Sequence, residues 1–560
     1  MKRFLPALVV SFIPTASSFL IPPGDSSVRV LSSQSSTSRM SALRIGSENL
    51  SVEDVYNVVD ARNQHPAPIS AINLAAIWLL GLPLTTCLIL PLSLTYQVGK
   101  IISQSFGIFQ KIPDPRMTPI DSSVPIDYDD VIPRSERKYD IVVMGATGFT
   151  GSLCVRHLAK TYGVNRNVKW AIAGRSKAKL EEVKERWAKE LKDEEILHVD
   201  VIVVDTYKPT TLPALVQNTR AVASTTGPFE LYGSPIVEAC AKYGTHYADI
   251  TGEVNWSKHM KLAWEATSKR TGANIVSLCG SDAIPWDLST FIMEDTLKKE
   301  GEELRQVTFV DELVSQASGG TIATLLLNLH GGSRGQPRTD IDPFLRLSDG
   351  SLSSLNFSFT PSFVPVRISQ PSFLLGLYGG FFALSPANAA LVSNGVAQRQ
   401  LTESLTYKEY ARYQNFLSAL TSNVSLGLAL LWILNPITEF FITRFVLPKS
   451  GQGPTMEDME HNYFGCTVGY GIGSKGTKVE TILYFPEDQG YLCTAKMVVE
   501  SGLCLALESA NDITSSTVSK LSEPRRGGFW TPSNAMGHEL LSRLQNTGMQ
   551  FACKIIKPNA

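Results

Sequence analysis

The chain has 560 residues, of which 43% are hydrophobic and 18% charged, a composition typical of globular proteins. This length is enough for several compact domains of roughly 100–200 residues each. The 51 basic and 52 acidic side chains almost cancel, giving a formal net charge of -1. That balance argues against a nucleic-acid-binding protein, which would need a basic face.

Residues that could bind a metal ion or form disulfides show no organised spacing. The eight cysteines form no C-x-x-C pair, and the eight histidines show no metal-ligand spacing. Zinc sites and disulfide frameworks both depend on regular spacing. We therefore expect no bound metal, and free, mostly buried thiols in a reducing compartment.

The N-terminus has the composition of a targeting presequence. Residues 1–18 contain two basic residues, a short apolar stretch and then small residues, which is the pattern of a secretory signal peptide. Residues 19–44 are expected to be a transit-peptide-like segment, since 26–44 is rich in serine, contains arginine and lacks acids. The junction at Phe19 resembles the bipartite plastid presequences of algae with secondary plastids. We expect a plastid location. The alternative is that residues 1–18 are an ordinary signal peptide and that the protein is located in the endomembrane system or on lipid droplets.

Three apolar segments could contact a membrane. Ala75–Val98 has no charged residue and exceeds the about 20 apolar residues that span a bilayer. Its Pro83 and Pro91 are tolerated in membrane helices, so we expect a transmembrane helix, with a re-entrant or surface-lying hairpin as the alternative. The segments Phe373–Val392 and Leu417–Ile437 contain more polar or helix-breaking residues. Each could equally be a span, a membrane-surface helix or a buried helix.

A dinucleotide-binding motif follows a polar linker. Tyr139–Met144 is predicted to be a buried strand, and a glycine-rich loop leads from it into a helix over Ser152–Tyr162. In this motif the three glycines permit a tight turn, close approach of the pyrophosphate and helix packing, and the phosphates sit at the helix N-terminus. The residues expected to bind the cofactor here are Gly145, Thr147, Gly148, Phe149, Thr150 and Gly151.

The second predicted strand, Val168–Ala173, indicates which dinucleotide is bound. Enzymes that prefer NAD usually place an acidic residue after this strand to hold the ribose 2′-hydroxyl. Here Arg175 and Ser176 occupy that place, and they suit a 2′-phosphate, so we expect NADP(H). The alternative is that Arg175 only starts a loop and faces solvent.

The alternation of strands and helices continues to about residue 278 and predicts a Rossmann-type, doubly wound parallel α/β sheet. Asp205, at the end of the third strand, is expected either to contact the adenine side of the cofactor or to cap a turn. Thr226 and Gly227 follow the fourth strand. Ligands of open parallel sheets lie beyond the carboxyl ends of the strands, so we expect both residues near the cofactor.

Several motifs together resemble one family. They are GATGFTG from Gly145, AGRS at Arg175, TTGPF from Thr225, YADITGE from Tyr247, CGSDAIPWD from Cys279 and GGFWTP from Gly527. The chain from about Lys138 to Cys553 resembles the saccharopine dehydrogenase-like oxidoreductases, which include trans-acting enoyl reductases and lipid-droplet-associated eukaryotic members. The resemblance implies an NADP-binding Rossmann domain at 138–300, a second α/β domain at 301–450 that contacts substrate or membrane, and a C-terminal part at 451–555 that packs back on the core.

A reductase of this kind could also need a proton donor beside the hydride. The candidates on the loops after the strands are Tyr232, Tyr247, Asp249, Glu253 and Asp282. Each also has a structural interpretation, because Tyr247 could belong to the core, Asp249 and Glu253 could close a turn, and Asp282 could cap the next helix. The sequence does not choose among them.

Two functions from different classes fit these features. The first is a membrane-associated NADP(H)-dependent oxidoreductase that transfers hydride to an apolar, lipid-like small molecule. The second is a non-catalytic NADP(H)-binding scaffold on a membrane or lipid droplet. Homo-oligomerisation stays open, and the substrate class depends on analogy and on the apolar segments.

Overall fold

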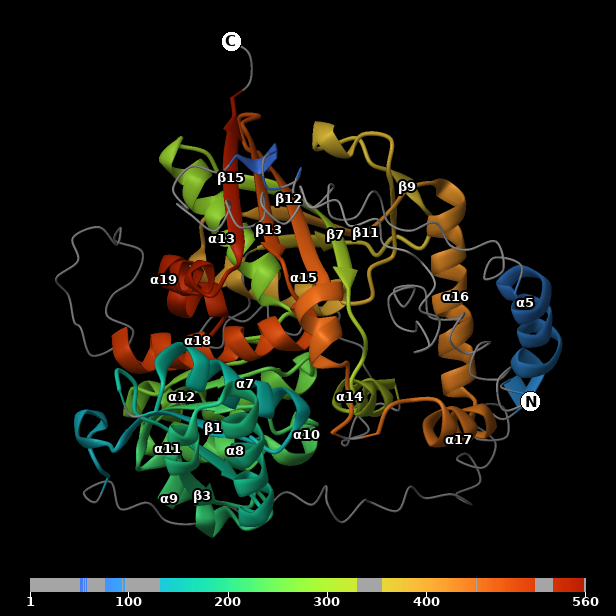
Figure 1. Ribbon diagram of the computed structural model, residues 1–560. Helices are drawn as coiled ribbons and strands as arrows, with labels where there is room; N and C mark the ends of the chain where they lie inside the picture. Colours follow the sequence, from blue (N-terminus) through green and yellow to red (C-terminus); the bar gives the residue numbers. More distant parts are fainter. Residues whose placement is uncertain are drawn as a thin grey trace, which may run out of the picture.

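The computed structural model describes most of residues 51–57, then 76–95 except 93, 131–329 except 165, and 355–557 except 450 and 509–526. The presequence expected over residues 1–44 lies outside the described residues. Two sheets dominate the molecule, and most helices pack against them (Figure 1).

The first sheet is the dinucleotide-binding sheet. Its seven strands are all parallel, in the order β14-β6-β5-β4-β1-β2-β3. The order from β3 to β6 is that of doubly wound dinucleotide folds, so the expected Rossmann sheet is confirmed. Its strands are β1 (Tyr139–Met144), β2 (Trp170–Gly174), β3 (Asp200–Val203), β4 (Thr219–Ser224), β5 (His246–Asp249), β6 (Asn274–Val276) and β14 (Gly528–Trp530).

Helices cover both faces of this sheet, which explains why its central strands are nearly continuous apolar runs. Side chains of β1 alternate between two cores, with Ile141 and Val143 in one and Val142 and Met144 in the other. The first core contains α7 (Phe149–Tyr162), α8 (Lys177–Leu191) and α18 (Thr494–Glu508). The second contains α9 (Leu212–Val216), α11 (Ser234–Tyr243) and α12 (Val254–Thr271).

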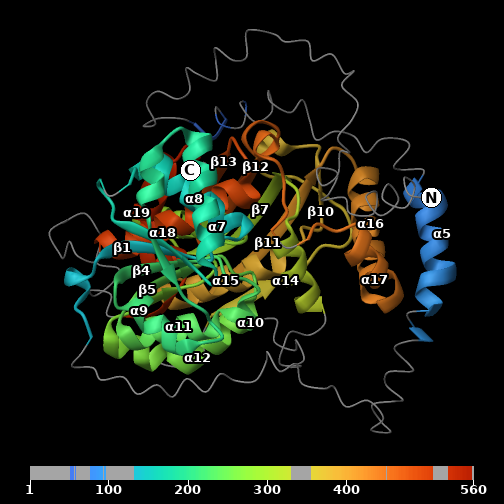
Figure 2. The ribbon, with the colours of Figure 1, turned by 60° about the horizontal axis from the view of Figure 1, so that its bottom comes forward.

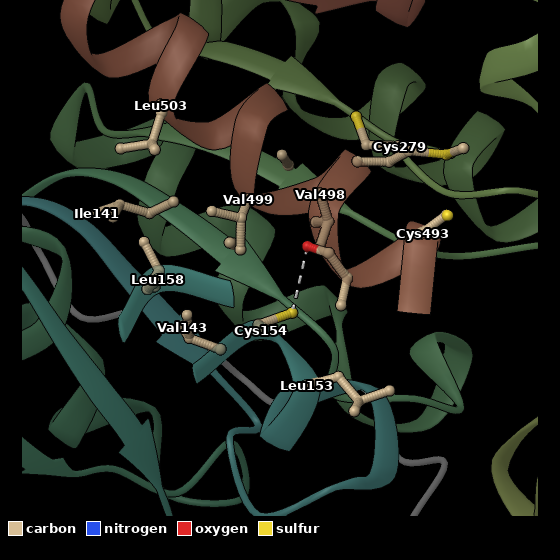
Figure 3. Packing of buried hydrophobic residues seen from close by; sticks show 14 of the residues in the cluster. Ile141, Val143, Leu153, Cys154, Leu158, Cys279, Cys493, Val498, Val499 and Leu503 are labelled. Atoms are coloured by element: carbon tan, nitrogen blue, oxygen red, sulfur yellow. Dashed lines mark hydrogen bonds between the residues drawn. The ribbon is translucent and has the colours of Figure 1, made fainter. Parts of the chain in front are cut away.

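Helix α18 comes from the C-terminal part of the chain yet packs on the first sheet. Val498, Val499 and Leu503 lie against β1 and α7 (Figure 3). In α7, the Cys154 thiol donates a hydrogen bond to the Ala495 carbonyl at 3.7 Å. The continuous helical stretch Gln489–Leu507 is apolar enough to cross a membrane, but 83% of it is buried, and we therefore assign it to the core.

The second sheet is mixed, in the order β15-β13-β12-β7-β11-β10-β9, with β8 paired to β11. Helices α13 (Ile284–Lys299) and α15 (Ser385–Arg399) cover one of its faces. A Cβ on Gly469 of β12 would lie 2.5 Å from Met293 Cε, so this glycine lets α13 approach closely. The strands are β7 (Leu304–Val314), β8 (Asn356–Phe359), β9 (Val366–Arg367), β10 (Tyr378–Gly380), β11 (Ser404–Tyr413), β12 (Phe464–Gly473), β13 (Lys478–Phe485) and β15 (Gln550–Ile556).

The part of the chain after residue 451 contributes strands or helices to both sheets. It supplies β12, β13 and β15 to the second sheet, and α18 and β14 to the first. Helix α19 (Pro532–Asn546) packs on both α18 and α13. The two sheets therefore do not divide at the expected boundaries of residues 300 and 450, since α13, within 138–300, also packs on the second sheet.

The three apolar segments have different structures. The segment Phe373–Val392 contains β10 and the first half of α15; its last residues, 388–392, are buried in the core, whereas Leu375 before β10 is 61% exposed. The segment Leu417–Ile437 forms α16 (Phe416–Leu434) and the start of α17 (Pro436–Phe445). Helix α16 is long and apolar enough to cross a membrane, and only 39% of it is buried.

The described part of Ala75–Val98 is helical and lies beside α16 in both views (Figures 1 and 2). Its turns are η1 (Ala76–Gly81), α5 (Leu82–Leu84) and η2 (Thr85–Ile89), of which η1 and η2 are π-helical. Pro83 lacks an N–H group, and prolines and π-turns commonly disturb a helix together. This segment and α16 are called the paired apolar helices below.

Candidate functional site

The glycine-rich loop connects β1 to α7 as expected. Gly145 has φ +87°, a conformation that favours glycine. A Cβ on Gly151 would lie 2.2 Å from the Gly145 carbonyl oxygen, so only glycine allows this approach. Gly148 precedes α7 without a side-chain cap, which leaves the N-terminus of this helix suited to a phosphate.

The other predicted residues of this loop differ in their surroundings. Thr147 is exposed and Thr150 is half-buried in the first turn of α7. The Phe149 ring instead contacts the edge of Tyr491, with 5.2 Å between ring centres. It also fills the space beside Gly453, whose added Cβ would lie 2.5 Å from the ring. Phe149 therefore joins the loop to the C-terminal part, a role that local sequence does not reveal.

The end of β2 forms a second corner of the site. Arg175 is exposed, and its guanidinium carbon lies 5.8 Å from the centre of the Tyr232 ring. The Tyr207 ring contacts Tyr232 edge-on at 5.6 Å. Ser176 caps α8 by accepting a hydrogen bond from Lys179 N at 3.4 Å. A cation beside two rings, at the carboxyl ends of β2, β3 and β4, suits a phosphorylated adenosine.

Asp205 caps the turn after β3, which is the second of the two roles expected for it. Its carboxylate accepts a hydrogen bond from Tyr207 N at 3.1 Å, which closes the turn after β3. The ring of Tyr207 is thereby held at the edge of the site. Tyr207 was not among the predicted site residues, because no local motif distinguishes it from an exposed loop tyrosine.

The two threonines after β4 have different roles. Thr225 Oγ1 donates to the carbonyls of Met144 and Gly145, both at 3.2 Å, and so holds the glycine loop. Thr226 Oγ1 is buried and has no hydrogen-bond partner among the described residues. It lies 2.7 Å from the position of a Cβ on Gly145, so it faces the expected phosphate site. Gly227 is exposed beside it.

Two of the five acid–base candidates are structural. Tyr247 is completely buried in the second core of the first sheet, and burial raises its pKa well above the ordinary value. Asp249 is also completely buried and accepts hydrogen bonds from Thr251 N, Leu278 N and Ser277 Oγ, all at 3.1 Å. Burial raises the Asp249 pKa to about 6. It ties the ends of β5 and β6 together.

Glu253 links two loops at the site. Its carboxylate accepts hydrogen bonds from Phe229 N at 2.9 Å and Glu230 N at 2.6 Å, at the start of α10 (Phe229–Tyr232). Burial raises its pKa to about 7. Thr324 Oγ1 of α14 (Gly319–Leu329) donates to it at 3.4 Å. Both carboxylate oxygens are therefore engaged by the protein.

Asp282 has the surroundings of a proton donor. It precedes α13 without capping it, since no side chain caps that helix. It has no hydrogen-bond or ion-pair partner among the residues that the structure describes. Its Oδ2 lies 3.3 Å from the position of a Cβ on Gly252, in the loop after β5. Burial raises its pKa to about 6. Of the five candidates, Asp282 alone combines a raised pKa with a carboxyl group that binds nothing else.

The second sheet closes over these loops. After β7, Ser315 Oγ bonds to Asp488 at 2.5 Å, and Ser318 N donates to the Tyr491 hydroxyl at 2.5 Å. Thr494 Oγ1 accepts from Ser281 N at 3.0 Å, next to Asp282. Helix α14 begins just after Ser318, and some of its apolar side chains are exposed, with Leu325 39% exposed. In both views it lies between α10 and α17 (Figures 1 and 2).

No group of three or more metal-ligating side chains occurs within the described residues. The site therefore consists of a phosphate loop, an adenosine corner, one carboxyl group without a partner among the described residues, and an apolar helix that contacts Glu253 through Thr324. Its residues suit a dinucleotide, because backbone N–H groups, Thr226 and Arg175 all offer hydrogen bonds to phosphate.

Comparisons with known proteins agree with this geometry. Residues 141–276 match the saccharopine dehydrogenase NADP-binding domain family. The chain is 30% identical over 437 residues to the trans-acting enoyl reductase of Mycobacterium ulcerans, covering 74% of this chain and 97% of that protein. A Mycobacterium tuberculosis protein described as a trans-acting enoyl reductase is 31% identical over 435 residues, again with 74% and 97% coverage. The apo saccharopine dehydrogenase of Saccharomyces cerevisiae aligns with 75% of this chain and 100% of its own, at 13% identity and a TM-score of 0.41, too distant to bear on function.

Proposed function

Because the chain belongs to the saccharopine dehydrogenase-like family of NADP-dependent oxidoreductases, we propose that it reduces a carbon–carbon double bond in an apolar, lipid-like substrate at a membrane. Bound NADPH would supply the hydride. The relatives are named enoyl reductases, and this name motivates an enoyl group, a double bond conjugated to a carbonyl, as the acceptor.

The observation that carries the substrate class is the position of α14. This helix keeps apolar side chains half-exposed next to the loop that carries Glu253. Leu325 and its neighbours offer a surface for an acyl chain, while Thr324 of the same helix reaches Glu253. The helix lies on the side of the site that faces α17 (Figures 1 and 2), and an apolar substrate could arrive from that side.

The residues of the site would have separate roles in this reduction. Gly145, Gly148 and Thr226 bind the pyrophosphate, and Arg175 binds the 2′-phosphate. Hydride addition to the β-carbon leaves negative charge on the α-carbon and carbonyl, which must then gain one proton. Asp282 would donate that proton, since its raised pKa keeps a useful fraction protonated near neutral pH.

The decisive experiment uses stereospecifically deuterated NADPH with medium- and long-chain enoyl thioesters and with a plastid lipid extract. We expect one deuterium in the product, detected by mass, and faster turnover of longer acyl chains. Replacing Leu325 with Asp should weaken the long-chain preference while leaving NADPH binding unchanged. A non-catalytic NADP(H)-binding scaffold would bind NADPH but transfer no label to any substrate.

The presequence supports a separate proposal about location. A fluorescent protein fused behind residues 1–44 should enter the plastid of an alga with secondary plastids. Retention in the endomembrane system or on lipid droplets would contradict a plastid location without affecting the proposed reaction.

A further inference from the structure

The paired apolar helices are joined to each other by polar contacts as well as by packing. Trp78 Nε1 donates to Thr421 Oγ1 at 3.1 Å, and Trp432 Nε1 donates to Thr85 Oγ1 at 2.8 Å. Leu82 packs between these contacts on Leu428 and Ala429 of α16. Residue numbers rise in the same direction along both helices. The two helices therefore run parallel and form one unit.

Both ends of α16 are attached to the body of the protein. Near its start, the Phe416 ring contacts the Tyr378 ring of β10 edge-on at 6.1 Å, and further along the helix Asn423 Oδ1 accepts a hydrogen bond from Phe381 N at 2.9 Å. After α17, Gln452 O accepts from Gly319 N at 2.9 Å, at the start of α14. The return stretch from the end of α16 to Gln452, residues 435–451, is shorter than the about 20 apolar residues of a span and contains Glu439, Arg444 and Lys449. The chain cannot cross a bilayer along α16 and return within this stretch.

The first of the paired apolar helices, within residues 75–98, is connected to the body of the protein both before and after it in the sequence. Upstream, Val52 and Val55 are buried against the second sheet, and Glu53 forms an ion pair with Lys554 of β15. Downstream, the chain enters β1 at Tyr139. The sequence of residues 96–130 has no uncharged run longer than ten residues, since Lys100 and Lys111 interrupt it. A single crossing at 75–98 would place its two flanks on opposite sides of the membrane.

The outer surface of the paired apolar helices and of the adjoining α17 is strongly apolar. Leu79 of η1 is 72% exposed, and Phe440, Phe441 and Phe445 of α17 are 60%, 50% and 69% exposed. Apolar patches of this extent on a soluble monomer mark a contact surface. Arg444, exposed on α17 among these aromatic rings, suits the anionic headgroups at a leaflet surface.

We infer that the protein is monotopic: the paired apolar helices and α17 enter one lipid leaflet, and neither helix of the pair crosses the bilayer. This inference rests on the proposed membrane association and replaces the transmembrane helix expected at 75–98. It retains the alternative of a re-entrant or surface-lying segment. It also places α14, whose Thr324 contacts Glu253 of the site, near the lipid surface on the same side as the cofactor.

The test places a cysteine on each flank of the first of the paired apolar helices. Cys87 and Cys553 are the two exposed cysteines among the described residues, and both are first replaced by Ser in the full chain. The exposed residues Asn57 and Ser135 are then changed to Cys, one in each variant. The proteins are bound to sealed phosphatidylcholine–phosphatidylglycerol vesicles and treated with an impermeant maleimide. We expect equal labelling of both variants before and after detergent. Protection of either cysteine until detergent is added would overturn the one-leaflet arrangement and favour a span.

A second pair of variants identifies the occupant of the apolar surface. The double change Phe440→Asp and Phe445→Asp should reduce flotation with the vesicles at least several-fold. Leu262→Asp, at a leucine that is 54% exposed on α12, should leave flotation unchanged. If the unaltered protein fails to float, the proposed membrane association is wrong. If it floats, but the double variant changes only self-association measured by sedimentation, a second copy of the chain covers this surface.

Discussion

The guanidinium carbon of Arg175 lies 5.8 Å from the centre of the Tyr232 ring, so the loop after β2 meets the helix after β4. Tyr232 was considered as a proton donor, but this contact places it at the adenosine corner. The ring holds an otherwise exposed arginine near the place of the 2′-phosphate. Cofactor preference should therefore depend on both residues.

We expect Arg175→Ala to weaken NADPH binding roughly ten-fold or more and to leave NADH binding nearly unchanged. A hydrogen bond to a charged group contributes about 1.5–3 kcal/mol, and about 1.4 kcal/mol corresponds to ten-fold in affinity. Titration calorimetry with both cofactors measures the difference. Tyr232→Phe, which keeps the ring, is the matched control and should bind NADPH normally. Equal losses for both cofactors in Arg175→Ala would show that the arginine does not bind the 2′-phosphate.

Thr226→Val should weaken NADPH and NADH binding alike, by roughly five-fold or more, because a lost hydrogen bond costs about 1 kcal/mol or more. The folded apo-protein should lose no stability, since Thr226 Oγ1 has no partner among the described residues. Thr225→Val is the contrasting variant. Its hydroxyl bonds to Met144 O and Gly145 O, so its thermal midpoint should fall. If Thr226→Val lowers the midpoint and spares affinity, the hydroxyl has a structural role instead.

The glycine loop offers a pair of variants that separate binding from folding. A side chain at Gly148 would meet only the Gly145 carbonyl, at 3.2 Å, and its extended backbone accepts any residue. Gly148→Val should therefore keep a folded circular-dichroism spectrum but bind no dinucleotide. Gly151→Ala brings a Cβ to 2.2 Å from Gly145 O and should also destabilise the fold. Persistent NADPH binding in Gly148→Val would exclude the loop as the phosphate site.

The first sheet and its cofactor could be predicted because their signals are local. The β1 run, the glycine spacing and Arg175 lie within one βαβ unit, and each residue type has a direct steric or electrostatic reason. The contact of Phe149 with Tyr491 could not be predicted. It joins residues far apart in the sequence, and neither residue has a distinctive neighbour pattern.

The acid–base candidates show the same limit. Asp249, Glu253 and Asp282 all lie at or after the ends of strands and are equivalent in the sequence, but their partners differ. Asp249 and Glu253 accept backbone hydrogen bonds, whereas Asp282 has no such partner among the described residues. A hydrophobic stretch in the sequence likewise does not show whether it packs in the core or lies at the surface. The α15 part of segment 373–392 lies in the core and much of 417–437 at the surface because of tertiary packing alone.

Asp282 should have a measurable effect on stability that depends on pH. Burial raises its pKa from 3.8 to about 6, so the ionised form is disfavoured in the folded state. The cost is absent below about pH 3, where both states are protonated, grows between about pH 4 and 6, and is constant above that. Asp282→Asn should therefore raise the free energy of unfolding by about 1–2 kcal/mol at pH 8, allowing for the partial exposure of the side chain, and by almost nothing at about pH 3. Urea denaturation at the two pH values measures this difference.

The same carboxyl group should control turnover. With an enoyl thioester that serves as substrate, kcat/KM should fall as pH rises above about 6, because the protonated fraction of Asp282 decreases. Asp282→Asn should lower kcat by about 10²-fold or more and remove this pH dependence, with NADPH affinity unchanged. Glu253→Gln is the control, since that carboxylate is held by Phe229 N and Glu230 N; its turnover should keep the fall above about pH 6. If Glu253→Gln removes the pH dependence and Asp282→Asn retains it, Glu253 is the proton donor and the assignment of Asp282 is wrong.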